Sequence, residues 1–410
     1  MKKGQFESHI LILVTLGLTA FGLVMVYSAT SAPAALGGGD PGFYLKRQAI
    51  YAVIGIALLV IASRTDFRTL RYMAPILVLT SAFLCLAVLG VGEEVNGARR
   101  WLTFGPLTFQ PSELAKISLA IWAAAYLARH RAPRSLAELA RPIGLTVGAF
   151  CALILIEPDL GTVISLVVVV GTILIVSGVP IRVLAGGGSI MLAVGIAAIW
   201  ATPYRRERFF AFLDPWQDPQ GTGYQTVQAM MGLASGGIFG TGVGQGVSKN
   251  SYLPEAHTDM IFAIIGEELG LIGTSLVIGA YVALAYAGLR VALRCKDPFG
   301  KRLAAGMIAL ISGQALINLA AVLGLAPLTG ITLPFVSYGG SSLVVSLAAV
   351  GVLLNIAGDA GQARASVPDR SRGNRRPRRA VAGGRGGARS PRGKRDVRRV
   401  AGSRRGAARS

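Results

Sequence analysis

Long apolar stretches alternate with short polar ones over residues 1–358 of this chain. A helix needs about 20 apolar residues to cross the hydrocarbon core of a bilayer, whereas a soluble helix shows only an apolar stripe on one face. The pattern therefore predicts an all-α polytopic membrane protein with about ten transmembrane helices. The predicted helices are 10–28, 48–62, 73–91, 112–128, 142–156, 162–178, 183–201, 260–288, 303–324 and 341–357.

The composition supports a membrane protein. Of the 410 residues, 52% are hydrophobic and 15% are charged, and the mean hydropathy is +0.56, which excludes an ordinary soluble domain. The three cysteines form no CxxC pair, so neither a disulfide framework nor a zinc finger is indicated. The first apolar stretch is too long for a signal peptide and further spans follow it, so we interpret it as an uncleaved helix.

The Lys and Arg residues of the loops predict the orientation in the membrane. An even number of spans puts both termini on one side, where the loops hold fifteen Lys and Arg residues against eight on the other side. Because positively charged loops stay in the cytoplasm, both termini are predicted to be cytoplasmic. The large loop 202–258 between helices seven and eight is then extracytoplasmic, and residues 1–358 form one membrane domain.

Residues 359–410 have a different composition. They hold seventeen Lys and Arg residues against three Asp, which gives +14 of the formal net charge of +21, and few large apolar residues. This composition predicts a disordered basic cytoplasmic tail. Anionic lipid or an acidic partner is the expected binding partner of the tail, and nucleic acid is less favoured.

Four of the predicted helices begin on the outer side with a polar cluster: "QPSELAK" (110–116), "EPDLGT" (157–162), "EAHTD" (255–259) and "SYGGSS" (337–342). Helix N-termini favour anions, phosphate above all, and arginines in the neighbouring loops add positive charge. We therefore expect a pocket for a phosphorylated substrate on this face. The candidate substrate-binding residues are Arg100, Glu113, Lys116, Asp159, Arg205, Arg208, Glu255, His257, Ser337, Gly339 and Gly340.

Several of these residues have a structural alternative. Glu113 and Lys116 are three positions apart and could pair with each other, although charge within a span is a sign of function by default. Asp159 could cap the helix that follows it, and Asp259 could do no more than stabilise a helix dipole. The residues alone leave these alternatives open.

The remaining polar motifs are weaker signals. The stretch "GTGVGQG" (240–246) is similar to a GxGxxG pattern but follows no predicted strand, so we expect a flexible loop rather than a nucleotide site. His257 could orient a carboxylate, and a single histidine does not indicate a metal site. We predict no metal ligands and no certain cofactor, and whether a divalent cation such as Mg²⁺ or Mn²⁺ takes part stays open.

The polar motifs together resemble a known family. "NGARRW", "QPSELAK", "EPDLGT", "RRERFFAFLDPWQDPQGTGYQ", "YLPEAHTDMIFAIIGEELG" and "LPFVSYGGSS" occur in the order and spacing of the SEDS proteins (shape, elongation, division and sporulation). The resemblance covers residues 10–357. "VMVYSAT" and "LPEAHTD" are more similar to the division members than to the elongation members, which usually have Gln in place of Ala256.

The resemblance implies a peptidoglycan glycosyltransferase that polymerises lipid II outside the cytoplasmic membrane, with Asp259 of the "HTD" motif as the proposed catalytic base. An inverting displacement of undecaprenyl pyrophosphate needs one base and a stabilised leaving group, so a single carboxylate is sufficient. The helix N-terminus lowers the pKa of Asp259 whereas burial and Glu255 raise it, and the sequence leaves the balance open.

The implied partners are lipid II, the nascent glycan chain on undecaprenyl pyrophosphate, a class B penicillin-binding protein (a transpeptidase) and other division proteins, at the septum. Three alternatives remain. They are a lipid II transporter (flippase), a noncatalytic scaffold for a transpeptidase, and an elongation role instead of a division role.

Overall fold

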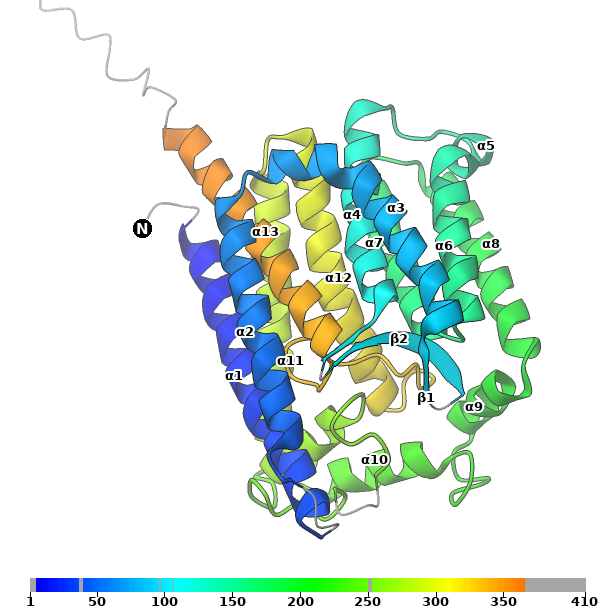
Figure 1. Ribbon diagram of the computed structural model, residues 1–410, viewed down its shortest axis with the longest axis vertical. Helices are drawn as coiled ribbons and strands as arrows, with labels where there is room; N and C mark the ends of the chain where they lie inside the picture. Colours follow the sequence, from blue (N-terminus) through cyan, green and yellow to red (C-terminus); the bar gives the residue numbers. More distant parts are fainter. Residues whose placement is uncertain (1–4, 37–39, 96, 106, 250–252, 366–410) are drawn as a thin grey trace, which may run out of the picture. The chain divides into compact units, whose positions relative to one another are not determined.

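The computed structural model describes residues 5–36, 40–95, 97–105, 107–249 and 253–365, and most of the described chain is helical (Figure 1). Residues 250–252 of the predicted outer loop and residues 366–410 of the predicted basic tail lie outside this part. The elements are α1 (Gln5–Leu36), α2 (Phe43–Arg64), α3 (Phe67–Val91), β1 (Glu93–Val95), β2 (Ala98–Phe104), β3 (Leu107–Phe109), α4 (Pro111–Arg129), α5 (Leu136–Leu139), η1 (Ala140–Gly144), α6 (Leu145–Ile156), α7 (Leu160–Val176), α8 (Ile181–Trp200), α9 (Pro203–Leu213), α10 (Tyr224–Ser235), α11 (Ile261–Arg294), α12 (Pro298–Val322) and α13 (Gly340–Ala365).

The predicted class, an all-α polytopic membrane protein, is confirmed. Within the described residues, eight helical segments are long and apolar enough to cross a membrane, and α7 is a shorter apolar helix. The remaining predicted span corresponds to α4, which carries Glu113 and Lys116 near its start. The count of ten spans and the side on which the termini lie stay predictions.

The helices differ in how much of their apolar surface is covered by protein. In the central helix α12, 72% of an 18-residue apolar window is buried, whereas in α8, at one edge of the bundle in Figure 1, only 11% of such a window is buried. The outer helix α3 exposes large apolar side chains such as Ile76, Leu79 and Phe83. Lipid tails are the natural surroundings of such a surface, so the packing agrees with the membrane class.

A small antiparallel sheet, ordered β1-β2-β3, joins α3 to α4. This sheet was not expected from the sequence, because its strands are short and lie between two long apolar stretches typical of helices. Gly97 (φ 74°) and Gly105 (φ 59°) have the left-handed backbone conformation that only glycine adopts without strain, and they lie at the two turns. Helices α9 and α10, inside the predicted outer loop, were also missed.

Two other segments differ from the sequence expectation. Helix α13 continues to Ala365, beyond the predicted end of the membrane domain at residue 358. The loop 240–246 is a loop as expected, but the main chain fixes it to α11: Thr241 N–H donates to Glu267 O (2.9 Å) and Gly242 N–H donates to Glu268 O (3.0 Å). The helix α11 is interrupted nearby at Gly270, which has a φ of 65°.

Small residues allow the helices α2 and α13 to approach closely. A methyl group on Gly351 of α13 would lie 2.5 Å from Leu59 O and 2.9 Å from the Ala62 Cβ atom, both on α2. Small residues at such crossings are typical of membrane helix pairs, because they let backbones touch.

We therefore expect Gly351→Ala to lower the stability of the protein by about 1–3 kcal/mol through overpacking. Gly358→Ala on the same helix is the matched control, since nothing lies within 4 Å of the added methyl group. Thermal unfolding of the detergent-solubilised variants checks this. Equal unfolding temperatures for the two variants would show that α2 and α13 do not pack as closely as described.

Candidate functional site

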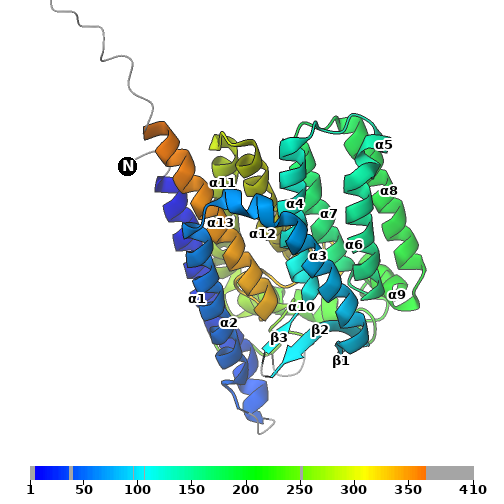
Figure 2. The same cartoon turned by 45° about the horizontal axis from the view of Figure 1, so that its top comes forward.

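Hydrogen bonds join the starts of α4, α7, α11 and α13 at one end of the helix bundle (Figures 1 and 2). The Gln110 N–H donates to Ser341 Oγ (2.9 Å), and the Gln110 side-chain amide donates to Asp159 Oδ2 (3.1 Å), which links α4 to α13 and to α7. The Tyr338 N–H donates to His257 O (2.8 Å), which links the segments that precede α13 and α11. The structure therefore brings together the four polar clusters that the sequence analysis singled out.

Asp259 lies immediately before α11, and only 9% of its surface is exposed. Its Oδ1 atom accepts a hydrogen bond from the Thr258 hydroxyl (3.3 Å). Its carbonyl oxygen accepts from Asn318 Nδ2 of α12 (2.7 Å), and the same amide donates to Ile331 O (2.7 Å). One amide thus ties the backbone of Asp259 to α12 and to the segment before α13.

Burial decides the acidity of Asp259. Loss of water raises the pKa of this carboxyl to about 6, the negative charge of Glu255 adds to the rise, and Arg208 opposes it. Desolvation and the charge of Glu255 therefore outweigh the opposing effects of Arg208 and of the hydrogen bond from Thr258. A carboxylate with this pKa is mostly ionised at pH 7.5 and is a stronger base than an exposed Asp.

Glu255 and His257 lie beside Asp259 but differ in exposure. Glu255 is exposed, and its φ of 53° is a strained value for a non-glycine residue. The His257 ring packs against the rings of Tyr44 (centroid distance 4.6 Å) and Tyr338 (5.5 Å). Burial lowers the pKa of His257 despite the opposing charge of Glu255, so the ring is neutral at pH 7. A neutral ring fits a hydrogen-bonding or orienting role rather than a charged one.

Arg100 and Arg205 lie at the C-terminal end of α6. Arg100 donates to the carbonyl oxygens of Glu157 (2.8 Å) and Pro158 (2.5 Å), and Arg205 donates to Leu155 O (3.1 Å). Burial, and then the positive charge of Arg100, lower the pKa of Arg205. Because these hydrogen-bond partners are carbonyls and not carboxylates, the two positive charges stay available to attract an anion.

Lys116 and Glu113 form the pair that the sequence analysis gave as their structural alternative. Lys116 is only 1% exposed, and its Nζ atom donates to Glu113 Oε1 (2.8 Å) and to Gln314 Oε1 (2.8 Å). The Gln314 amide in turn donates to Ser342 Oγ (2.9 Å) and Thr332 O (3.0 Å). The substrate-binding roles of both residues stay predictions, and in this conformation the lysine fixes α4 to α12.

Asp159 caps α7, as its alternative reading suggested. Its carboxylate accepts from the Thr162 N–H (2.9 Å) and the Thr162 hydroxyl (2.7 Å). Its neighbour Glu157, which the sequence analysis did not single out, is 1% exposed, and neither of its carboxylate oxygens has a hydrogen-bond partner among the described residues. Burial first, and the charge of Asp159 second, raise the pKa of Glu157 to about 8, so this acid is largely protonated at pH 7.

Ser337, Gly339 and Gly340 shape the turn that leads into α13. The Ser337 hydroxyl is buried and accepts from the Leu333 N–H (2.8 Å). A methyl group on Gly340 would collide with the ring of Tyr51, and one on Gly339 would meet a Thr332 side chain at 3.0 Å. The close packing at these two positions explains why they are glycines. The predicted contact of Ser337, Gly339 and Gly340 with substrate stays a prediction.

A buried ion pair was missed altogether. Lys249 Nζ lies 2.7 Å from Glu268 Oε1, and both side chains are almost fully buried. The available signal was two consecutive acids, Glu267 and Glu268, inside an apolar helix, which is a costly arrangement without a partner.

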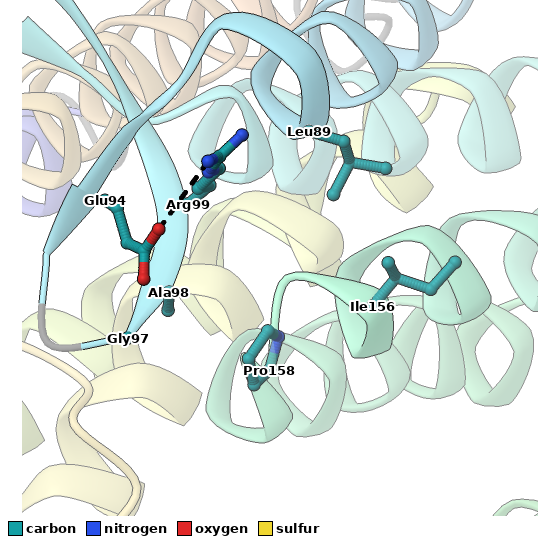
Figure 3. Close-up of a pocket in the computed structure, with 7 residues that line it drawn as sticks. All are labelled: Leu89, Glu94, Gly97, Ala98, Arg99, Ile156 and Pro158. Carbon is teal, nitrogen blue, oxygen red and sulfur yellow. Dashed lines mark ion pairs between the residues drawn. The ribbon is translucent and has the colours of Figure 1, made fainter.

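The pocket in Figure 3 lies between the β1–β2 hairpin and the turn from α6 to α7, and it has a volume of about 260 Å³. An ion pair between Arg99 and Glu94 (3.6 Å) borders it. Its lining contains none of the predicted site residues, so we do not assign the substrate to it. The lining residues are Leu89, Glu94, Gly97, Ala98, Arg99, Ile156 and Pro158.

Within the described residues, no group of three His, Cys, Asp or Glu side chains is arranged to hold a metal ion. The participation of Mg²⁺ or Mn²⁺ therefore stays open.

A sequence profile described as "Cell cycle protein", that of FtsW, RodA and SpoVE, matches residues 8–361. The chain belongs to the FtsW/RodA/SpoVE family. This confirms the resemblance to SEDS proteins. Among curated FtsW/RodA/SpoVE members, a probable peptidoglycan glycosyltransferase FtsW of Geobacter sp. (strain M18) is 40% identical over 87% of this chain and 98% of its own length. Stage V sporulation protein E of Bacillus subtilis is 39% identical over 85% of this chain and 96% of its own length.

Solved structures of FtsW/RodA/SpoVE-like chains have the same fold. One chain, from a study of how a peptidoglycan synthase complex coordinates polymerization and crosslinking, has a TM-score of 0.72 and 32% identity, covering 85% of this chain and 97% of that chain. The rod shape determining protein RodA of Thermus thermophilus has a TM-score of 0.62 and 29% identity, covering 85% of this chain and 96% of that chain.

The contacts of Lys116 generate a testable prediction. Lys116→Met leaves the Glu113 carboxylate buried without its cation, so we expect a loss of about 3–5 kcal/mol in stability, seen as a lower unfolding temperature in detergent. The matched double variant Glu113→Gln with Lys116→Met removes both charges and should recover most of the loss. An unchanged unfolding temperature for Lys116→Met would contradict the structural role and favour the predicted substrate contact.

Proposed function

We propose that this chain is a peptidoglycan glycosyltransferase that polymerises lipid II on the outer face of the cytoplasmic membrane during cell division. Support comes from curated relatives about 40% identical that are named probable peptidoglycan glycosyltransferase FtsW. The observation that carries the mechanism is the buried carboxyl of Asp259, with a pKa raised to about 6, at the point where four helix starts meet.

In the proposed reaction, Asp259 acts as the general base. Its carboxylate takes the proton of the 4-hydroxyl group of one disaccharide while that oxygen attacks the anomeric carbon of the other substrate. The bond from this carbon to undecaprenyl pyrophosphate breaks at the same time, and pyrophosphate leaves with the electron pair. A single displacement inverts the anomeric centre and needs no carboxylate nucleophile, in contrast to retaining glycosidases.

Cationic side chains would stabilise the leaving pyrophosphate. The positive charge of Arg208 lowers the pKa of Asp259, which supports a role for this arginine near the base. Arg100 and Arg205 form a second positive group that donates hydrogen bonds to carbonyls, so an anion would not have to displace a carboxylate. We assign these three arginines to the pyrophosphate and leave Lys116 in its buried pair.

A similar solved chain comes from a peptidoglycan synthase complex that coordinates polymerization and crosslinking, which supports a crosslinking enzyme as partner. We propose that this partner is a class B penicillin-binding protein. A transpeptidase would crosslink the glycan strands as they are made. We place this multi-pass membrane protein at the division septum with other division proteins, because the FtsW relatives match it at 39–40% identity. Polymerisation of purified lipid II by the reconstituted protein, alone and with a class B penicillin-binding protein, separates an enzyme from a flippase and from a scaffold.

Asp259→Asn and Asp259→Ala should abolish this polymerisation, because removing a general base costs about 10²–10⁴-fold in rate. Glycan products separated on gels give the rate. Binding of the penicillin-binding protein and the unfolding temperature serve as controls for a folded protein. Glycan made at a near-normal rate by Asp259→Asn would remove the base assignment.

The raised pKa of Asp259 predicts two opposite effects of pH. The polymerisation rate should fall as the pH drops through about 6, because the base becomes protonated. The folded-state pKa lies above the ordinary value of 3.8, so folding favours the protonated form, and the stability this gives is lost as the pH rises through 6.

Asp259→Asn should therefore stabilise the protein at pH 7.5, by at most about 3 kcal/mol, and should have little effect below pH 4. The exposed acid Glu207 on α9 provides the control variant, Glu207→Gln. Unfolding temperatures measured across this pH range check the sign. Destabilisation by Asp259→Asn at pH 7.5 would mean that the carboxylate is stabilised in the fold and not strained by it.

A further inference from the structure

Lys249, Glu268 and Ser28 form a polar cluster inside the apolar part of the protein. Lys249 Nζ donates to Glu268 Oε1 (2.7 Å) and lies 3.3 Å from Ser28 Oγ, and the Ser28 hydroxyl lies 2.7–2.8 Å from both Glu268 oxygens. Glu268 is completely buried and Lys249 is 4% exposed. The cluster joins three elements, namely the loop after α10, the helix α11 and the helix α1.

The neighbouring carboxylate binds the same loop. Glu267 Oε1 accepts from the Val247 N–H (2.7 Å), and both Glu267 oxygens lie 3.2 Å from the Ser248 nitrogen. Together with the bonds from Thr241 and Gly242 to the carbonyls of Glu267 and Glu268, these contacts attach residues 241–249 to α11. Glu267 and Glu268 therefore serve together as one anchor for the loop 241–249.

Along the chain, Asp259 lies between the loop that this anchor holds and the start of α11 at Ile261. The Leu253 N–H donates to Ser248 O (2.9 Å), beside Lys249, so the start of the segment 253–260 is bonded to the anchored loop. The segment ends where α11 begins at Ile261, and α11 itself carries Glu267 and Glu268. Closing such a loop at both ends restricts the conformations that remain to it. Local turns restrict the segment further, because the N–H groups of Thr258 and Met260 donate to Glu255 O (3.0 and 3.4 Å).

A buried ion pair is weak evidence for a purely stabilising role. Apolar side chains of similar volume are often as stabilising as the pair, because both charges lose their water. A buried ion pair is, however, stable in only a few arrangements, because every polar atom of the two side chains needs a hydrogen-bond partner. A role in fixing the position of a chain segment would explain why the protein keeps a pair whose burial costs free energy.

We propose that the ion pair of Lys249 with Glu268 is a positioning device, which fixes the start of the segment 253–260 and so keeps the carboxyl group of Asp259 out of water. The proposal rests on the proposed function of Asp259 as a base. Loss of water is the first cause of the raised pKa of Asp259, so opening the segment should lower it. Glu255 in the same segment and Arg208 on α9 also act on the pKa of Asp259. His257 of this segment packs against Tyr44 and Tyr338, and Arg47 acts on Tyr338. The test leaves all of these groups unchanged.

The test compares Lys249→Met, Lys249→Arg and the double variant Lys249→Met with Glu268→Met in the full-length protein. Hydrogen–deuterium exchange of residues 253–260 reports the order of the segment without any need for activity. We expect Lys249→Met and the double variant to raise this exchange roughly tenfold, and Lys249→Arg to restore protection. Lys46→Met, which breaks an exposed ion pair with Asp40, is the control and should change nothing.

Polymerisation kinetics provide the second measurement. In Lys249→Met and in the double variant, kcat should fall about 10²-fold with KM little changed, as expected for a misplaced base. In the pH profile of the polymerisation rate, the midpoint on the acid side should move from about pH 6 towards pH 3.8. If Lys249→Met fails to fold, the double variant decides, because it carries no unpaired buried charge.

A double variant with wild-type exchange, kcat and pH midpoint would overturn the proposal, because the pair would then serve stability alone. Failure of the proposed function is a separate result. If the wild-type protein makes no glycan but the double variant still loses protection at residues 253–260, the positioning role stands and the assignment of the reaction falls.

Discussion

The removal of Asp259 from water is the constraint on which the chemistry of this site depends. A carboxyl at the start of a helix would ordinarily be a weak base, because the helix dipole stabilises its ionised form. Here burial and the charge of Glu255 raise the pKa of Asp259 and outweigh the attraction of Arg208. The protein can keep this destabilised group only because the surrounding helices hold it in place, which is a common feature of catalytic sites.

The polar groups around Asp259 form a connected structure rather than separate contacts. Gln110 joins three of the helix starts, and Asn318 ties the Asp259 carbonyl to the segment before α13. Deeper in the bundle, Lys116 and Gln314 connect α4 to α12. Buried networks of this kind fix one arrangement, because any shift leaves a polar atom without a partner. The site is thus positioned by polar contacts and enclosed by apolar ones.

The sequence predicted the helices well and the contacts between them poorly. Apolar runs located the spans, and polar clusters at helix starts identified Asp259 and its neighbours, because both signals are local. The partner of Lys116 on α12 is 198 positions away, and Ser28 is 240 positions from Glu268, so only the folded chain shows these contacts. Likewise Arg100 and Arg205 read as free charges in the sequence, whereas the structure places them on the carbonyls at the end of α6. The burial of the Asp259 side chain, which raises its pKa, also depends on tertiary packing and cannot be read from the sequence.

The central claim is that Asp259 is a buried carboxyl kept basic by desolvation. A titration of the Asp side-chain carboxyl carbons by ¹³C NMR, with the Asp259 signal assigned from its absence in Asp259→Asn, measures this pKa directly in the detergent-solubilised protein. We predict a midpoint near 6. A midpoint at or below the ordinary value of 3.8 would show that the helix dipole and Arg208 prevail, and would contradict the account.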